Sequence, residues 1–303
     1  MRIGIGNTAY LRDDNDDAGL ARMRAHGYTS MNYDMADTAL PLYGDAPAAL
    51  ERRMRAFRER AESHGITVDQ THGPWRWPPQ DATEEQRTER FEKMCTALRA
   101  TALLGAKCCV IHPVMPFGCD KDPAPERLWA INGAFFSRLA AEAERCGVAI
   151  GLENMPMPAL SLARPAEILR LVREIGSAGL KICLDTGHCL VTGQQPGDAV
   201  RPIGRDLLAA LHVHDNDGTG DFHRWPFTGK ADWADFSAAL GEIGFSGPLM
   251  LETSLRFFGH VPADFAEPLQ IALSRIARHI ADAAESDRTP ISVPKVTEPC
   301  PKM

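Results

Sequence analysis

The sequence predicts an α/β fold, a closed (β/α)8 barrel formed by a single domain over residues 1–285. Eight short apolar or alternating segments recur along the chain with longer amphipathic segments between them, the pattern of βα units around a parallel sheet. The length of 303 residues is compatible with one such domain, because these barrels often run to about 200–250 residues or more. No glycine-rich loop of the GxGxxG or GxxxxGKS/T type follows the first expected strand, which argues against the alternative of a doubly wound open sheet.

The elements follow one another in a regular order. Strands are expected at residues 2–6, 29–34, 67–72, 107–113, 148–153, 180–185, 209–214 and 249–252. Helices are expected at 18–26, 46–64, 83–104, 126–146, 165–175, a short segment near 201–207, 233–243 and 263–284. Three of these helices are followed by Gly65, Gly147 and Gly244, as expected where glycine supplies a left-handed C-terminal turn. Residues 286–303 contain several prolines and no periodicity, so we expect a flexible C-terminal tail.

Composition and charge exclude several classes of protein. With 44% hydrophobic and 24% charged residues, the chain has an ordinary globular composition. Its formal net charge of −7 argues against a nucleic-acid partner, because such proteins usually carry a basic surface. No segment reaches roughly 18 consecutive apolar residues and the N-terminus does not resemble a signal peptide, so we expect a cytoplasmic protein without membrane contact. None of the eight cysteines forms a CxxC pair, which favours reduced, mostly buried thiols.

Acidic and imidazole side chains end six consecutive strands of the expected barrel. They are His72, His112, Glu153, Asp185 with His188 shortly after it, His212 and His214, and Glu252, and the loop after strand seven adds Asp221 and His223. The carboxyl ends of barrel strands form one mouth, where the active site lies. Carboxylates and imidazoles gathered there would repel or stay unpaired unless a cation joins them. Nitrogen and oxygen donors of this kind suit zinc or manganese, so we predict a divalent metal site of one to three ions.

Each of these residues also has an ordinary structural explanation. A single His72 or His112 is more often a hydrogen-bonded core histidine than a metal ligand, and Asp185 could simply initiate a turn. His212 and His214 share one face of a strand, so either could be the ligand while the other supports it. The metal interpretation depends on position, because the ordinary explanations would have to hold independently at six strand ends.

Aromatic and basic residues accompany this mouth. Trp75, Trp77 and Trp225 could either pack the rim or form walls against which a sugar ring stacks. Arg224 and Arg256 follow strands seven and eight, a region where barrels often bind phosphate or carboxylate groups. The residues that we expect to contact substrate are His188, Trp75, Arg224 and Arg256.

The motifs ENMP, LDTGH, HVHDNDG, DFH and LET, in this order, resemble those of the xylose isomerase-like TIM barrel superfamily. That superfamily contains sugar and sugar-phosphate isomerases and epimerases, and also endonuclease IV. The resemblance covers about residues 1–280. It implies a shared metal ion held by the residues that end strands five to eight, which are Glu153, Asp185, His212 and Glu252.

The resemblance to endonuclease IV extends further along the chain. It implies additional ligands at the ends of strands three and four, after the strand-six aspartate and in the loop after strand seven, which are His72, His112, His188, Asp221 and His223. By this resemblance three ions could bind, with Glu153 bridging two of them. Epimerases of the ketohexose type instead carry an arginine near Asp221 and His223, so their substrate contacts are not expected to transfer directly.

Two enzymatic hypotheses agree with these residues. The first is a metal-dependent isomerase or epimerase of a sugar or sugar phosphate, in which Glu153 and Glu252 exchange a proton across an enediolate, one as base and one as acid. The alternative is an endonuclease IV-like multinuclear zinc phosphoesterase or hydrolase, or a metal-dependent dehydratase or lyase. Acidic loops at the mouth argue against DNA and favour a small carbohydrate-like substrate. A binding protein without chemistry is a third option, and barrels of this superfamily often pair, so a homodimer is compatible with the resemblance.

Overall fold

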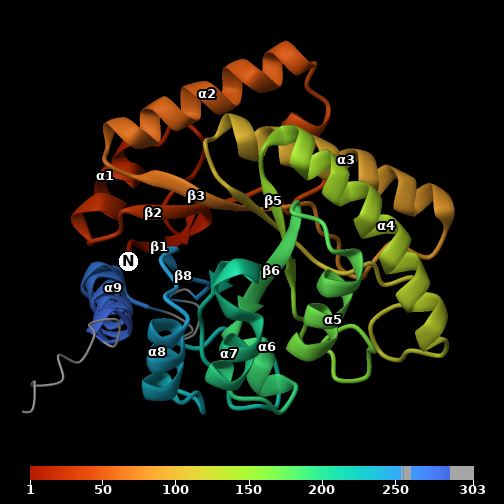
Figure 1. Ribbon diagram of the computed structural model, residues 1–303. Helices are drawn as coiled ribbons and strands as arrows, with labels where there is room; N and C mark the ends of the chain where they lie inside the picture. Colours follow the sequence, from red (N-terminus) through yellow and green to blue (C-terminus); the bar gives the residue numbers. More distant parts are fainter. Residues whose placement is uncertain (254, 256–260, 287–303) are drawn as a thin grey trace, which may run out of the picture.

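The computed structural model describes residues 1–253, 255 and 261–286 (Figure 1). Eight parallel strands form one sheet in the order β7-β6-β5-β4-β3-β2-β1-β8. Their bounds are Ile3–Gly6 for β1, Ser30–Asp34 for β2, Thr67–His72 for β3, Cys108–Ile111 for β4, Ala149–Glu153 for β5, Leu180–Asp185 for β6, Leu208–His212 for β7 and Leu249–Leu251 for β8.

The sheet closes between β7 and β8. The N–H of Val213 donates to the carbonyl of Met250 at 2.8 Å, and the carbonyl of Val213 accepts from the N–H of Glu252 at 3.1 Å. The strands therefore form the predicted (β/α)8 barrel, and the carboxyl ends of all eight strands lie at one mouth.

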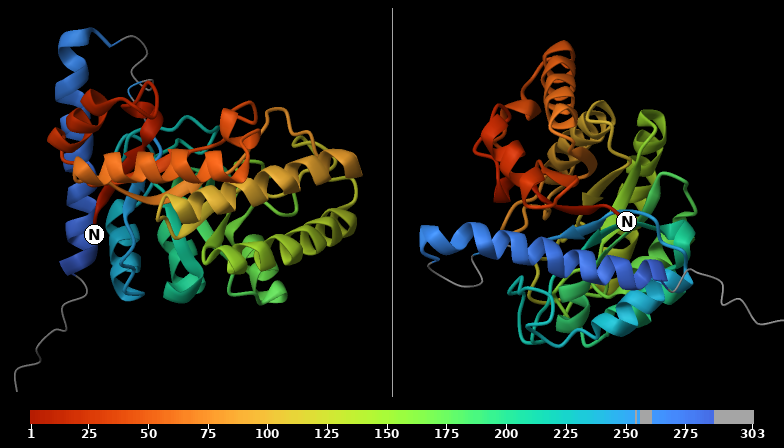
Figure 2. Two further views of the ribbon diagram at one scale, coloured as in Figure 1. Left: turned by 90° about the horizontal axis from the view of Figure 1, so that it is seen from above. Right: turned by 90° about the vertical axis from the view of Figure 1, so that its left-hand side faces the viewer.

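Helices surround the strands, as Figures 1 and 2 show. Their bounds are Asp17–Ala25 for α1, Pro47–Ser63 for α2, Glu84–Leu103 for α3, Pro125–Cys146 for α4, Pro165–Ile175 for α5, Thr186–Val191 for α6, Pro196–Leu207 for α7, Trp233–Glu242 for α8 and Ala263–Ser286 for α9. Two 3-10 turns, η1 at Asn7–Ala9 and η2 at Pro41–Tyr43, follow β1 and β2. Helix α9 runs along the side of the barrel where the N-terminus lies (Figure 2), and the guanidinium of Arg278 donates to the carbonyl of Met1 at 2.8 Å.

The helix ends follow from local chemistry. Thr83 accepts from the N–H of Gln86 at 3.3 Å, and the side chain of Gln86 accepts in turn from the N–H of Thr83, so α3 begins in a capping box. Gly65, Gly147 and Gly244 have φ of 73°, 70° and 65°, which confirms the predicted left-handed turns after α2, α4 and α8.

The main difference from the expected elements lies after β6. Residues 186–191 form the short helix α6, whereas no helix was expected there, and α7 begins at Pro196 instead of near residue 201. Six residues span fewer than two helical turns, which is too short for an apolar period to be visible in the sequence. The strands themselves are present at all eight expected places, although several are shorter than expected.

The interior beneath the mouth is closely packed. Cys108, Val110, Cys183 and Ala210 form a small buried cluster between β4, β6 and β7. A Cβ atom added to Gly151 would lie 2.8 Å from Sγ of Cys108, so glycine allows this close approach on β5 two residues before Glu153. The seven described cysteines are all unpaired, and four of them are buried.

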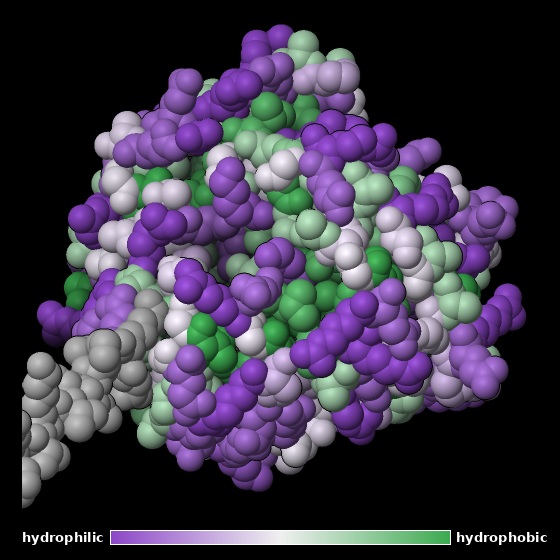
Figure 3. All heavy atoms as spheres, viewed as in Figure 1, coloured by the Kyte–Doolittle hydropathy of each residue, from purple (hydrophilic) through white to green (hydrophobic). Residues whose placement is uncertain are grey.

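The described surface carries mostly hydrophilic residues on the face in Figure 3, with apolar residues in smaller patches between them. No helix of the described residues is long and apolar enough to cross a membrane. The tail was predicted from residue 286, but Ser286 is the last residue of α9. The rest of the predicted tail, from residue 287 onward, and Arg256 lie outside the described residues.

Candidate metal centre

The polar residues predicted from the strand ends gather at the mouth of the barrel. A cavity of about 820 Å³ opens there, and eight of the nine predicted ligands line it, namely His72, His112, Glu153, His188, His212, Asp221, His223 and Glu252. The ninth, Asp185, is fully buried, and it offers a ligand atom within 4.8 Å of those of Glu153, His212 and Glu252. We call Glu153, Asp185, His212 and Glu252 the central group.

The central group is built around His212. Nδ1 of His212 lies 2.8 Å from Oε1 of Glu153 and 2.7 Å from Oε2 of Glu252. Burial opposes charge on the imidazole, but the Glu252 and Glu153 carboxylates raise the pKa of His212 well above its usual value. Burial likewise opposes charge on Glu153, yet the imidazoles of His212 and His112 lower its pKa well below the usual value. The Glu153 and Glu252 carboxylates thus favour a positive charge between them, and in this structure the His212 imidazole supplies it.

A second group, the histidine pair, consists of His72 and His112 beside Glu153. Their Nε2 atoms are 3.1 Å apart, and Nε2 of His112 lies 3.0 Å from Oε2 of Glu153. Burial lowers the pKa of His112 to about 4 despite the charge on Glu153, so its imidazole is neutral at pH 7 and has a free nitrogen lone pair. Because Oε1 of Glu153 faces His212 and Oε2 faces His112, this one carboxylate joins the two groups.

A third group, the loop group, combines His188, His214, Asp221 and His223. Oδ2 of Asp221 lies 3.3 Å from Nε2 of His188 and 3.1 Å from Nε2 of His223. The His214 ring stacks on that of His223 at 4.3 Å, and its Nε2 lies 2.9 Å from Oδ2 of Asp185. Burial opposes charge on His188, but Asp185 and Asp221 raise its pKa to about 10. His212 and His214 therefore face different groups.

Three of the imidazoles are oriented by backbone carbonyls. Nδ1 of His72, His188 and His223 lies 2.9, 2.7 and 2.7 Å from the carbonyl oxygens of Gly73, Asn154 and Glu252, respectively. A carbonyl oxygen can only accept, so each Nδ1 carries the hydrogen and donates it. In the neutral ring Nε2 then presents its lone pair to the site, the arrangement usual for metal-bound histidine.

The donor set fits divalent metal ions. Imidazole nitrogen and carboxylate oxygen come together within 4.8 Å in the central group and in the histidine pair with Glu153. In the loop group they do so at His214, Asp221 and His223, while His188 and His214 meet Asp185 in the same way. Such donors suit zinc or manganese. Cys183 also approaches Glu153 and His212, but burial raises the pKa of its thiol well above the usual value, so it remains a protonated core side chain.

Comparison with known proteins gives the family. The model of the xylose isomerase-like TIM barrel family matches residues 20–273. This chain belongs to the xylose isomerase-like TIM barrel family.

Individual relatives are distant. An uncharacterised protein of Methanocaldococcus jannaschii is 29% identical over 185 residues, which cover 57% of this chain and only 60% of that protein. A D-psicose 3-epimerase of Enterocloster bolteae is 25% identical over 232 residues, which cover 74% of this chain and 73% of the epimerase. The crystal structure of the IOLI protein with a bound zinc atom superimposes on this chain with a TM-score of 0.74 and 18% sequence identity. The superposition covers 94% of this chain and 99% of that one.

Asn154 supports the centre in this member of the xylose isomerase-like family, although sequence reasoning did not select it. Its Nδ2 donates to the carbonyl of Asp185 at 3.0 Å, and its Oδ1 accepts from the N–H of Asp185 at 2.8 Å. Oδ1 of Asp185 then accepts from the N–H of His188 at 2.6 Å and caps helix α6. These bonds hold Asp185 and His188 together across β5 and β6. Asn154 belongs to the ENMP motif, which is the feature of the sequence that could have pointed to this residue.

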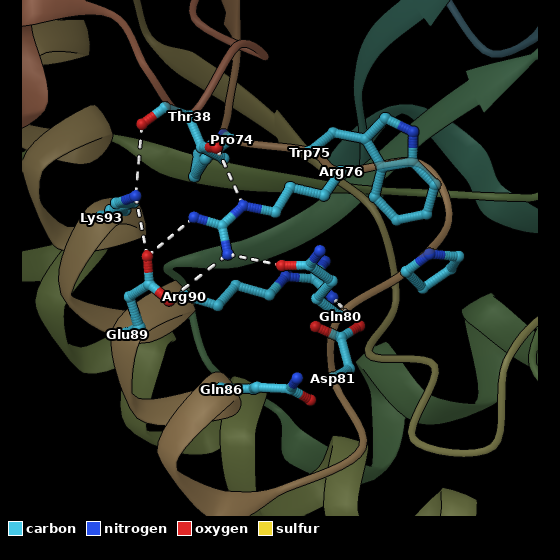
Figure 4. Close-up of a pocket in the computed structure, with 11 residues that line it drawn as sticks. Thr38, Pro74, Trp75, Arg76, Gln80, Asp81, Gln86, Glu89, Arg90 and Lys93 are labelled. Carbon is cyan, nitrogen blue, oxygen red and sulfur yellow. Dashed lines mark hydrogen bonds and ion pairs between the residues drawn. The ribbon is translucent and has the colours of Figure 1, made fainter.

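A buried ion pair supports the histidine pair from outside the barrel (Figure 4). Arg90 on α3 pairs with Asp81, and its guanidinium also donates to the carbonyl of His112 at 2.7 Å. Oδ2 of Asp81 accepts from the N–H of Met115 at 2.9 Å. The Trp75 ring packs edge-on against His112 at 4.4 Å, with the Arg90 guanidinium 5.9 Å from its centroid. The position of His112 is therefore set by both backbone and side-chain contacts.

The remaining predicted contact residues have different positions. Trp75 and Trp77 line the cavity, whereas Trp225 is buried in the core. Arg224 does not line the cavity and donates to Oδ2 of Asp217 at 2.6 Å. Arg256 lies outside the described residues, so its predicted role remains a prediction.

Proposed function

We propose that this protein is a metal-dependent epimerase or isomerase of a sugar, moving a proton at a carbon next to a carbonyl through an enediolate. The observation that carries this proposal is that carboxylate oxygens of Glu153 and Glu252 both lie within 2.8 Å of Nδ1 of His212, at an open cavity. The D-psicose 3-epimerase of Enterocloster bolteae, a relative at 25% identity, supports the same reaction class.

The side chains would divide the work of proton transfer. The chemistry that a divalent ion supplies in the central group is polarisation of the substrate carbonyl, which lowers the cost of removing the neighbouring proton. The Glu252 side chain is 34% exposed and that of Glu153 only 1%, so the Glu252 carboxylate is the more accessible base on the cavity side. Glu153, held by His112 and His212, would exchange the proton on the other face. Nε2 of His188 would steady the developing oxyanion.

Solvent exchange tests this proposal directly. Ketoses incubated with the zinc- or manganese-loaded protein in D2O should gain deuterium next to the carbonyl. Glu153→Gln and Glu252→Gln should slow this exchange by about 10²–10⁴-fold, because each removes one general acid or base. Glu62→Gln, which changes an exposed carboxylate paired with Arg58 on α2, should keep the exchange rate. Full exchange in both site variants would exclude the proton-transfer role.

A multinuclear zinc phosphoesterase is the second candidate. The histidine pair and the loop group supply donors beyond those that one ion in the central group needs, and this favours two or three ions. Nucleic acid is a poor substrate candidate, because no lysine or arginine lines the cavity among the described residues. Metal analysis and hydrolysis of bis(4-nitrophenyl) phosphate separate the candidates. Two or three zinc ions with hydrolysis lost in His112→Ala would support the phosphoesterase, and one ion without hydrolysis would support the epimerase.

A further inference from the structure

We propose that the cavity binds a sugar that carries a second ring, and that this second ring stacks on Trp77 and Phe222 at the rim. The inference deepens the proposed sugar chemistry, since it assumes that the first ring lies at the metal groups. A second sugar ring and an aromatic ring both present the apolar face that such stacking needs.

The cavity is larger than one sugar ring requires. Its volume of about 820 Å³ lies in the upper part of the range of about 300–1,000 Å³ that small-molecule sites occupy. The reacting groups lie at its buried end, where Glu153 and His212 are each 1% exposed. A single ring held there leaves the outer part of the cavity unfilled, so the outer part can take a second group.

The outer part is lined by aromatic side chains. Four large apolar side chains are strongly exposed in the described part of the chain, and two of them, Trp77 at 65% and Phe222 at 50%, line this cavity. Exposed apolar groups that gather at one cavity mark a binding surface more often than scattered ones do. Trp77 lies 6.3 Å from Trp75, which packs on His112, so one aromatic wall runs from the metal groups to the rim.

The two rim residues approach from opposite sides. Trp77 belongs to the loop after β3 and Phe222 to the loop after β7, and these strands are four places apart in the closed sheet of eight. The two loops therefore begin on opposite sides of the mouth, and both bring an exposed aromatic side chain to the cavity. Met155 and Met157, which also line the cavity, add flexible apolar surface between them.

The polar part of the lining is suited to a sugar. Lysine and arginine are absent from the described lining, whereas the carboxylates of Asp34 and Asp221 are present besides the glutamates. The Arg224 guanidinium lies 5.5 Å from the centroid of the Phe222 ring, so a positive charge stands beside one of the two rim residues although Arg224 does not line the cavity. Asn32 also lines the cavity, and its buried Oδ1 has no hydrogen-bond partner among the described residues, so it can accept from a sugar hydroxyl. The Asn32 acceptor suits the hydroxyl groups of a sugar.

Calorimetric titration of the metal-loaded full chain tests the inference without requiring turnover. The probes are methyl β-D-glucopyranoside, phenyl β-D-glucopyranoside and cellobiose, which share the first ring and differ in the second. The variants are Trp77→Ala, Phe222→Ala and the conservative Trp77→Phe. Phe265→Ala is the matched control, because Phe265 is 61% exposed and does not line the cavity.

We expect the phenyl glucoside or cellobiose to bind about three- to tenfold more tightly than the methyl glucoside, the range of one aromatic contact. Preference for the phenyl probe would identify an aromatic second ring, and preference for cellobiose a second sugar. Trp77→Ala and Phe222→Ala should remove the preference without weakening the methyl glucoside, while Trp77→Phe and Phe265→Ala should keep it. Equal binding of all three probes, or equal weakening of all three in Trp77→Ala, would overturn the inference.

Deuterium exchange into free ketoses without any preference for a second ring would leave the proposed function intact. A preference for a second ring without deuterium exchange would contradict the proposed function alone.

Discussion

At the scale of the residue, Asn154 shows how one amide organises a site that it does not enter. Two hydrogen bonds of its side chain go to the backbone of Asp185, a third goes to Sγ of Cys189, and its own carbonyl accepts from His188. Asn154→Ala would remove the side-chain partner of the buried N–H of Asp185 and one of the partners of its carbonyl, which would keep the Cys189 thiol. We expect a loss of about 1–3 kcal/mol in the free energy of unfolding and about 10–100-fold in zinc affinity, measured by competition with a chromophoric chelator.

The chain offers a matched control for this variant. Asn132 is equally buried, and its side chain brackets the backbone of Val114 with bonds of 2.8 and 2.9 Å, away from Asp185. Asn132→Ala should lower the stability by a similar amount and change the zinc affinity less. If both variants lost zinc affinity equally, the loss would reflect general destabilisation and not the position of Asp185.

At the scale of the element, helix α3 and the loop after β3 are joined by Arg90 and Asp81 (Figure 4). Arg90→Met would leave the buried Asp81 carboxylate without its cation, so we expect a loss of about 3–5 kcal/mol in the free energy of unfolding, measured by urea denaturation. The adjoining pair of Arg76 and Glu89 is far more exposed, at 31% and 45%. Arg76→Met should therefore cost only about 0.2–1 kcal/mol. Similar losses in the two variants would contradict the assigned role of burial.

Elements also show how far the sequence predicts the structure. The eight strands were predictable because their apolar runs are bounded by polar turns, and the strand-end residues follow because parallel strands place their carboxyl ends together. Residues from His72 to Glu252 therefore meet as expected in the described structure. Helix α6 was not predictable, because Asp185 starts it through a cap in a segment without a visible period. The burial of Trp225 and the pairing of Arg224 with Asp217 depend on loop geometry, which leaves no periodic signal.

At the scale of the whole molecule, the donors of the three groups come from six strands and their loops, between His72 and Glu252. An unfolded chain cannot bring these donors together, so under the proposed function metal ions would bind the native barrel in preference to the unfolded chain. Binding then stabilises the native state by about 2.7 kcal/mol when the free metal concentration is a hundredfold above its Kd.

Removal of metal should consequently lower the melting temperature. We expect a decrease of roughly 4–8 °C when a chelator is added to zinc-loaded protein, followed by differential scanning calorimetry. The decrease has a local cause, because the carboxylates of Glu153, Asp185 and Glu252 then face one another with only imidazole protons between them. In His212→Ala, which lacks the nitrogen at the centre of this group, the chelator should change the melting temperature much less. A wild-type melting temperature that is the same with zinc and with chelator would mean that these side chains neutralise each other without an ion.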